Sequence, residues 1–165
     1  MSFAQFPLDA RLQEGVAGMD FTTPTPIQVA AIPPALQGHD ILGSAETGTG
    51  KTAAYLLPTM HRLLHGPSPK NPQRTAPRVL VLVPTRELAL QVADHAERLG
   101  AHTKLRSVAV FGGVSLVNQE KALRQGVDIV IATPGRLLDH VQRRNISFAS
   151  LEVFVLDEAD RMLDV

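Results

Sequence analysis

Short apolar runs without polar alternation constrain the fold of this 165-residue chain more than any other feature. Val79–Val83, Asp128–Ala132 and Val153–Asp157 are dense in Val, Ile and Leu. Strands of this kind are buried on both faces, as in a parallel sheet that helices cover on each side. Two further runs, Asp40–Ser44 and Ser107–Phe111, predict two more strands.

Helical patterns alternate with these runs along the chain. Parallel strands need crossover connections, so helices between successive strands indicate right-handed βαβ units. The sequence therefore predicts one three-layer α/β domain over residues 1–165, with a mainly parallel sheet. Helices are predicted at Asp9–Met19, Pro26–Leu36, Lys51–Leu64, Arg86–Leu99, Leu116–Arg124 and Pro134–Arg143, with Asp9 and Thr25 as N-caps of the first two.

The composition excludes several classes of function. The chain has no cysteine, which excludes disulfides, thiolate catalysis and cysteine-ligated zinc. Sixteen basic residues balance sixteen acidic ones, so a nucleic-acid contact has to come from a local cluster. No signal peptide or membrane-spanning stretch is recognisable, and we predict a cytoplasmic protein. Gly66–Pro77, with four prolines, is predicted to be a solvated connection, although Lys70 and Arg74 leave partner binding open.

The residues after the first predicted strand match a phosphate-binding loop. Gly48 and Gly50 let the backbone curl so that N–H groups face phosphates at a helix N-terminus. Lys51 would reach the β- and γ-phosphates, and the Thr52 hydroxyl would join the shell of a magnesium ion. Ala45 stands where the motif usually has its first glycine. The predicted nucleotide-binding residues are Ala45, Glu46, Thr47, Gly48, Thr49, Gly50, Lys51 and Thr52.

An acidic pair ends the last predicted strand. Asp157 and Glu158 follow at its carboxyl end, where an open α/β sheet places ligand chemistry. Asp157 would hold Mg²⁺, directly or through water. Glu158 would orient or deprotonate the water that attacks the γ-phosphate. Together with Lys51, the pair predicts a nucleoside-triphosphatase site.

Several motifs, in their order along the chain, resemble those of the DEAD-box RNA helicases. The likeness covers essentially the whole chain. Asp157 to Asp160 spell the sequence that gives the family its name, residues 21–28 resemble its Q motif, and residues 84–89, 112–113 and 133–136 resemble its nucleic-acid-contacting motifs.

The resemblance implies a fold and an activity. The chain would be the first RecA-like domain of an ATP-dependent RNA helicase, cut off at its C-terminal end. In the family, ATP closes two such domains over single-stranded RNA and opens a short duplex. Because the second domain supplies an arginine finger, this chain alone is expected to bind ATP without RNA-stimulated turnover.

Recognition of adenine is also implied by the resemblance. Gln28 would pair through its carboxamide with adenine N6 and N7. Phe3 corresponds to the aromatic residue that packs on adenine, and Phe21 belongs to the same Q motif, which extends over residues 3–28. The sequence departs from the family at Asp20, where glycine is usual, and at Glu46, where glutamine is common.

The three nucleic-acid motifs follow predicted strands and so are expected along one edge of the sheet. Thr85 and Thr133 are candidate N-caps, and Arg86 and Arg136 lie beside the helix N-termini, which favours anion binding. Aromatic residues for base stacking are scarce, so contacts to the sugar–phosphate backbone should dominate. The predicted RNA-contacting residues are Pro84, Thr85, Arg86, Gly112, Gly113, Thr133, Pro134, Gly135 and Arg136.

Other interpretations are weighed against this one. An ATP-gated RNA clamp would share every motif but would not unwind, and a DNA helicase or an unrelated P-loop ATPase is opposed by Gln28 and the DEAD sequence. His61 and His65 have the spacing of zinc ligands on a helix, but Arg62 occupies the place of the general-base glutamate. The sequence leaves the RNA target and the oligomeric state open.

Overall fold

The computed structural model describes residues 1–69 and 74–163, and the chain divides into two units. Met1–Pro67 and His95–Lys104 form one unit, here called the helical unit. Ser68–Asp94 and Leu105–Val165 form the other, called the sheet unit. The phosphate-binding loop belongs to the helical unit, and the acidic pair and the nucleic-acid motifs belong to the sheet unit.

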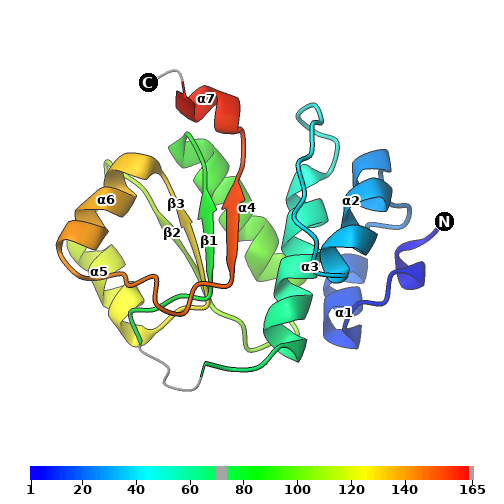
Figure 1. Ribbon diagram of the computed structural model, residues 1–165, viewed down its shortest axis with the longest axis horizontal. Helices are drawn as coiled ribbons and strands as arrows, with labels where there is room; N and C mark the ends of the chain where they lie inside the picture. The colour runs from blue at the N-terminus through cyan, green and yellow to red at the C-terminus, as the bar shows by residue number, and fades with distance from the viewer. Residues whose placement is uncertain (70–73, 164–165) are drawn as a thin grey trace. The chain divides into compact units, whose positions relative to one another are not determined.

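The described residues of the sheet unit contain four strands, all paired in parallel (Figure 1). The order β2-β3-β1-β4 places β1 and β3 in the interior of the sheet. The parallel α/β arrangement predicted from the apolar runs is confirmed, and each strand begins and ends within one residue of its prediction. The strands are β1 (Val79–Leu82), β2 (Ser107–Val110), β3 (Ile129–Ala132) and β4 (Val153–Leu156).

Side chains on both faces of the central strands are buried. Leu80 and Val130 share one face and pack in a cluster with Leu123 of α5 (Leu116–Gln125) and Leu137 of α6 (Pro134–Gln142). On the opposite face, the side chains of Val79, Val81, Ile129 and Ile131 are almost fully buried. Each buried methylene contributes roughly 0.8 kcal/mol, so these runs of Val, Ile and Leu hold the sheet in place.

The regular secondary structure among the described residues of the helical unit consists of helices only. The 3₁₀ helix η1 (Phe3–Gln5) precedes α1 (Ala10–Gly18), and Asp9 caps α1 as predicted, because its Oδ1 accepts a hydrogen bond from the Arg11 N–H at 2.9 Å. Next come α2 (Pro26–Leu36) and α3 (Lys51–His65). The helix α4 (Arg86–Leu99) begins in the sheet unit and ends in the helical unit, and α7 (Ala159–Leu163) follows β4.

The strand predicted at Asp40–Ser44 is wrong. Residues 39–46 have no regular structure, and the side chains of Ile41 and Leu42 are exposed. A strand is stabilised by hydrogen bonds to a neighbouring strand, and the described part of the helical unit offers none. The apolar composition of this run was therefore not sufficient to predict a strand.

The proline-rich connection is described on both sides of a gap. Residues 66–69 and 74–77 form neither helix nor strand, as predicted, and Lys70 lies outside the described residues. Among the helices described, none combines the length and the apolar character needed to cross a membrane.

We predict that Gly15→Ala destabilises the protein. A Cβ at Gly15 in α1 would lie 2.1 Å from the backbone carbonyl oxygen of Leu99 at the end of α4. Forcing atoms into a packed contact costs about 1–3 kcal/mol, and the free energy of unfolding in urea should fall by that amount. Gly18→Ala is the matched control in the same helix, since no atom lies within 4 Å of its Cβ position. It should raise stability by up to about 1 kcal/mol through helix propensity. Equal effects of the two substitutions would contradict the proposed contact.

Candidate functional site

The phosphate-binding loop has the backbone conformation that its glycines predict. Gly48 and Gly50 have φ angles of 85° and 80°, a left-handed region that favours glycine. The Thr49 hydroxyl donates to the carbonyl oxygen of Glu46 at 2.5 Å and closes the loop. Since α3 begins at Lys51, the loop leads directly into a helix N-terminus, where free N–H groups favour anions.

Gln28 of α2 is hydrogen-bonded to this loop. Its Nε2 donates to the carbonyl oxygen of Gly50 at 3.1 Å, and its Oε1 accepts from the Thr25 N–H at 2.9 Å. The side chain is buried, and a Cβ at Gly50 would lie only 2.4 Å from Gln28 Nε2. The carboxamide therefore fixes the start of α2 to the phosphate-binding loop, and one Nε2 proton and one Oε1 lone pair remain for a further partner.

The aromatic residues expected near adenine pack against one another. The Phe3 ring lies 5.7 Å from the Phe6 ring in an edge-on arrangement and 6.1 Å from the Phe21 ring in a stacked one. Phe3 is buried and Phe21 is partly exposed. Phe3, the predicted adenine contact, is thus covered by protein, whereas Phe21 of the same motif is partly exposed.

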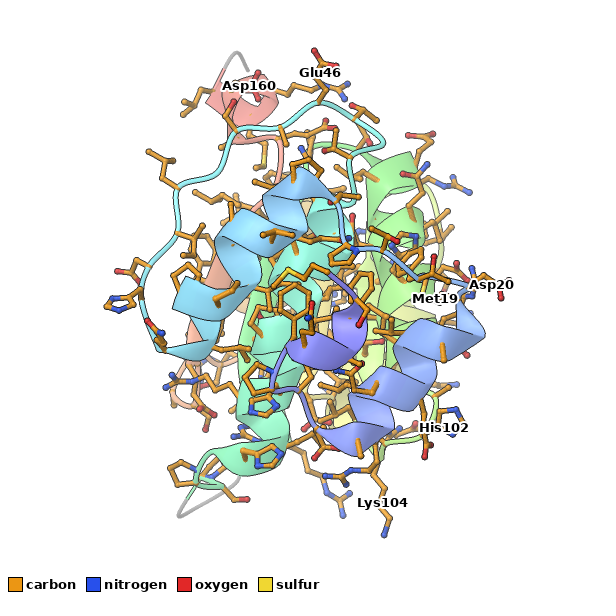
Figure 2. All side chains as sticks on the ribbon, turned by 90° about the vertical axis from the view of Figure 1, so that its right-hand side faces the viewer. Met19, Asp20, Glu46, His102, Lys104 and Asp160 are labelled. Carbon is orange, nitrogen blue, oxygen red and sulfur yellow. The ribbon has the colours of Figure 1, made fainter. Side chains whose placement is uncertain are left out.

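The two departures from the family pattern lie on the surface, as Figure 2 shows. Asp20, which follows Met19 after α1, has a φ of 57°. Glycine adopts this left-handed conformation without strain, and Asp and Asn adopt it more easily than most other residues. The backbone thus explains why a glycine suits this position. Glu46 is exposed in the loop between α2 and α3.

Four motifs share the carboxyl edge of the sheet. Because all strand pairs are parallel, the segments that follow β2, β3, β1 and β4 lie side by side in that order. Binding sites of open α/β sheets occur at this edge. The segments are residues 112–113 after β2, 133–136 after β3, 84–86 after β1 and 157–158 after β4.

Arg86 lies over the turn that follows β2. We call residues 112–114 the glycine turn. The Arg86 guanidinium carbon is 5.3 Å from the centroid of the Phe111 ring, and a Cβ at Gly113 would lie 3.4 Å from Arg86 Nη1. Gly113 has a φ of 82°, and Arg86 remains exposed. Thr85 caps α4 as predicted, since its Oγ1 accepts from the Leu88 N–H at 3.2 Å.

Arg136 also contacts this turn and is far less exposed than Arg86. Its Nη1 donates to the carbonyl oxygen of Val114 and to Gln119 Oε1, both at 3.1 Å. Its side chain is 13% exposed, and its Nε lies 3.6 Å from Asp139 Oδ2. Thr133 occupies the N-cap position of α6 but forms no capping hydrogen bond through its side chain, which differs from the prediction.

A buried polar chain behind the turn was missed from the sequence. Gln119 Nε2 donates to the carbonyl oxygen of Phe111 at 2.9 Å, and Gln119 Oε1 lies 3.0 Å from His140 Nε2. His140 Nδ1 lies 3.1 Å from Asn145 Nδ2. The signal was helical spacing, because Gln119 follows Leu116 by three residues and His140 follows Leu137 by three. Both are polar residues that share a helix face with apolar ones, Gln119 with Leu116 and Leu123, and His140 with Leu137.

The acidic pair lies where β4 ends. Asp157 is buried, and its N–H donates to the carbonyl oxygen of Leu82 at 3.0 Å. Glu158 has a φ of 52°, and its carboxylate accepts from Arg161 Nη1 at 2.8 Å. A residue other than glycine in this conformation costs about 1–3 kcal/mol, which is typical of functional sites.

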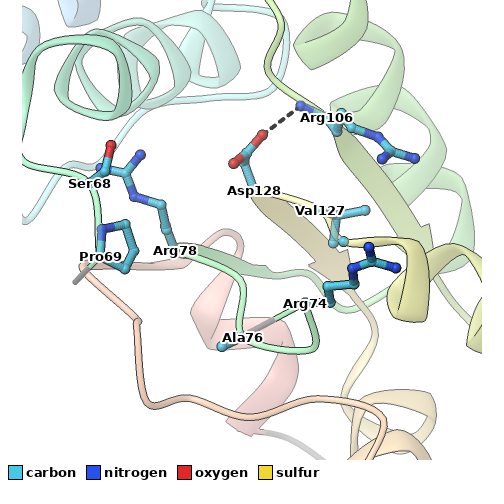
Figure 3. A pocket seen from close by; sticks show the side chains of 9 residues that line it. Ser68, Pro69, Arg74, Ala76, Arg78, Arg106, Val127 and Asp128 are labelled. Carbon is cyan, nitrogen blue, oxygen red and sulfur yellow. Dashed lines mark hydrogen bonds between the residues drawn. The ribbon is translucent and has the colours of Figure 1, made fainter. Parts of the chain in front are cut away.

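Two other clusters have different roles. His61 Nδ1 accepts from the Asp9 N–H at 3.0 Å, and His65 Nε2 lies 2.8 Å from Asp9 Oδ2, so these histidines hold the start of α1. Three arginines line a pocket of about 530 Å³ at the amino ends of the strands (Figure 3). In this view Arg78 extends away from Arg74 and Arg106. Arg78 pairs with Glu152, and Arg106 Nη2 donates to Gln125 Oε1 at 3.4 Å.

Comparison with known proteins identifies the family. The model of the DEAD/DEAH box helicase family matches residues 25–165. The chain belongs to this family. It is 51% identical over 164 residues to the ATP-dependent RNA helicase SrmB of Escherichia coli, which covers 99% of this chain and 36% of that protein.

Two further relatives of this DEAD/DEAH box chain are named ATP-dependent RNA helicase RhlB. The protein from Xanthomonas oryzae is 47% identical over 166 residues, covering 100% of this chain and 29% of the relative. The protein from Pseudoalteromonas atlantica is 44% identical over 163 residues, covering 99% and 38%. The chain therefore spans about a third of the length of these relatives.

We predict that the contribution of His140 to stability is lost in acid. Burial is the main cause that lowers the pKa of His140, and the charges of Arg136 and Arg143 lower it further. The carboxylates of Asp139 and Glu120 act in the opposite direction and raise it. As the pH decreases, the unfolded chain takes up the His140 proton near pH 6.5, whereas the folded chain takes it up only at a lower pH. The stability that neutral His140 provides is therefore present above pH 6.5 and is lost as the pH decreases below it.

Urea denaturation tests this prediction. The difference in unfolding free energy between the wild type and His140→Gln should be larger at pH 8 than at pH 5.5. His39→Gln serves as the control, because His39 is exposed and its substitution should change the unfolding free energy little. A difference for His140→Gln that does not change with pH would refute the prediction.

Proposed function

We propose that this chain is the ATP-binding part of an ATP-dependent RNA helicase. One observation carries the proposal: three motifs of the DEAD/DEAH box family form adjoining segments of a single sheet edge, and the acidic motif continues that edge on β4. The edge thereby brings a candidate anion-binding surface next to candidate hydrolytic residues. The names of the relatives support RNA as the substrate.

In the proposed ATP site, Lys51 neutralises the β- and γ-phosphates while the N–H groups of residues 45–50 surround them. Glu158 positions the attacking water. Thr52 of the helical unit offers a hydroxyl oxygen and Asp157 of the sheet unit a carboxylate oxygen, and each is a kind of ligand that Mg²⁺ prefers. When bound, Mg²⁺ would neutralise charge that develops on the phosphates.

In the proposed RNA site, the strand runs along the glycine turn and the N-termini of α4 and α6. Arg86 is exposed and already close to Gly113, which supports a contact with a phosphate. Pro84, Thr85, Gly112, Thr133, Pro134 and Gly135 supply backbone and hydroxyl groups beside it. Arg136 retains guanidinium donors that are not used by Val114 and Gln119.

The complete activity requires more than this chain. Because the chain spans about a third of its relatives, we propose that a second RecA-like domain closes over ATP and RNA in the whole protein. The absence of cysteine is compatible with the proposed cytoplasmic location. Displacement of a short RNA duplex by the whole protein would distinguish a helicase from an ATP-gated clamp.

We predict that Gln28 selects adenine. ATP should bind more tightly than GTP, because guanine has an acceptor, O6, where adenine has its N6 donor, while N7 is an acceptor in both bases. In Gln28→Ala the ratio of the two affinities should fall to about one, since a hydrogen bond to the base is worth about 1 kcal/mol. Titration with tripolyphosphate, which has no base, measures separately the effect of losing the Gln28–Gly50 bond.

Gln37→Ala provides the control, since Gln37 is exposed at the end of the same helix. It should leave both affinities unchanged. Equal discrimination between ATP and GTP in the wild type and in Gln28→Ala would remove Gln28 from base recognition.

We predict that Arg86 contacts an RNA phosphate. In the full-length protein with a non-hydrolysable ATP analogue, Arg86→Ala should weaken binding to poly-U and mixed RNA by similar factors. The slope of log affinity against log salt should decrease by about 0.7, the contribution of one neutralised phosphate on a single strand. ATP affinity without RNA should not change.

The control for this experiment is Arg143→Ala, which removes an exposed arginine at the opposite end of α6 from Arg136. Its salt slope should equal that of the wild type. A loss confined to one RNA sequence would indicate contact with a base instead, and an unchanged slope for Arg86→Ala would place this arginine outside the RNA site.

A further inference from the structure

Gln119 joins three segments of the sheet unit through one buried carboxamide. Its Oε1 accepts from Arg136 Nη1 at 3.1 Å and lies 3.0 Å from His140 Nε2, while its Nε2 donates to the carbonyl oxygen of Phe111 at 2.9 Å. The side chain is 7% exposed, so water has little access to replace a lost partner. Buried polar groups left without a partner cost about 1–3 kcal/mol each.

These partners permit only one orientation of the carboxamide. If the amide were rotated by 180°, its NH₂ group would face the Arg136 donor, and its oxygen would face the Phe111 carbonyl oxygen. Both contacts would be repulsive. The orientation follows from the chemistry of the neighbours and also determines the state of His140, whose Nε2 has to carry a proton to donate to Gln119.

Asn145 is the last member of this series of hydrogen-bonded side chains, on the other side of the His140 ring. With the proton on Nε2, the neutral ring accepts at Nδ1 from Asn145 Nδ2, 3.1 Å away. Asn145 and His140 are both buried. The imidazole therefore cannot turn without breaking a hydrogen bond at each nitrogen, and Gln119 is held from behind.

This hydrogen-bonded network around Gln119 contacts both ends of the glycine turn. Phe111, just before the turn, gives its carbonyl oxygen to Gln119, and Val114, at the end of the turn, gives its carbonyl oxygen to Arg136 at 3.1 Å. Arg136 is in turn bonded to Gln119. The left-handed Gly113 lies between these two fixed carbonyl groups.

We propose that Gln119 is a positioning residue that clamps the glycine turn, through Phe111 and Arg136, in the shape that binds the RNA backbone. His140 and Asn145 support the clamp by fixing the orientation of Gln119. The inference rests on the proposed RNA-binding function of this edge. It assigns to Arg136 a role inside the protein in addition to its proposed contact with RNA.

Two substitutions separate the parts of the clamp. Gln119→Leu has a similar volume and removes every hydrogen bond. Gln119→Glu keeps acceptors for Arg136 and His140 but cannot donate to Phe111 when it is ionised. Gln142→Leu, at an exposed position of α6, is the matched control for adding a leucine.

The test uses the full-length protein. In Gln119→Leu, hydrogen exchange of the amides of residues 111–115 should accelerate, and the affinity for RNA with a non-hydrolysable ATP analogue should fall about tenfold, as expected for the loss of hydrogen bonds to a charged group. The KM for RNA should rise while kcat and the KM for ATP remain unchanged. Gln119→Glu should have a smaller effect, and Gln142→Leu none.

Three outcomes would overturn the proposal. Unchanged exchange at residues 111–115 in Gln119→Leu would show that the turn does not depend on Gln119. Faster exchange with unchanged RNA affinity, while Arg86→Ala weakens binding, would show that RNA does not use the clamped shape. Equal losses in kcat and in the affinities for ATP and RNA would reduce Gln119 to a residue of the core.

The proposed function can fail separately. If the wild type binds no RNA under conditions in which it binds ATP, RNA recognition at this edge is refuted, and the RNA part of the inference with it. Hydrogen exchange, which needs no RNA, then still decides whether Gln119 clamps the turn.

Discussion

Parallel hydrogen bonding between four short strands is the constraint on which the remaining features of the sheet unit depend. The strands run in one direction, so every segment that leaves a strand at its carboxyl end begins at the same edge. Four motifs that are separated by up to 70 residues of sequence thereby become neighbours, and each position along the edge is determined by the order of the strands. The apolar side chains of β1 and β3, buried on both faces, hold this order.

The two arginines at this edge show how position determines the use of the same side chain. Arg86 lies over an aromatic ring and remains exposed, so its charge is available to a polyanion. Arg136 is partly buried, and its Nη1 donates to Val114 and to Gln119. An arginine suits both positions, because its planar group offers five donors in fixed directions.

Much of the fold followed from local patterns, and the failures have a common physical cause. The run at residues 79–83 was sufficient to predict a buried strand, whereas the similar run at residues 40–44 was not, because strand formation depends on a partner that periodicity does not reveal. The left-handed glycines of the phosphate-binding loop were foreseen from the motif. The partial burial of Arg136 and the role of Gln119 were not, because they depend on contacts between α5, α6 and the segment after β2 that only the folded chain brings together.

The clamped glycine turn has a consequence for the thermodynamics of any ligand that binds to it. A turn that is already held at both ends loses little conformational freedom on binding, so the entropic cost of ordering it falls on folding of the chain. Loosening the turn would shift this cost to the binding step. Calorimetry would then record the weaker affinity mainly as a less favourable binding entropy, with the contacts themselves and their enthalpy largely retained.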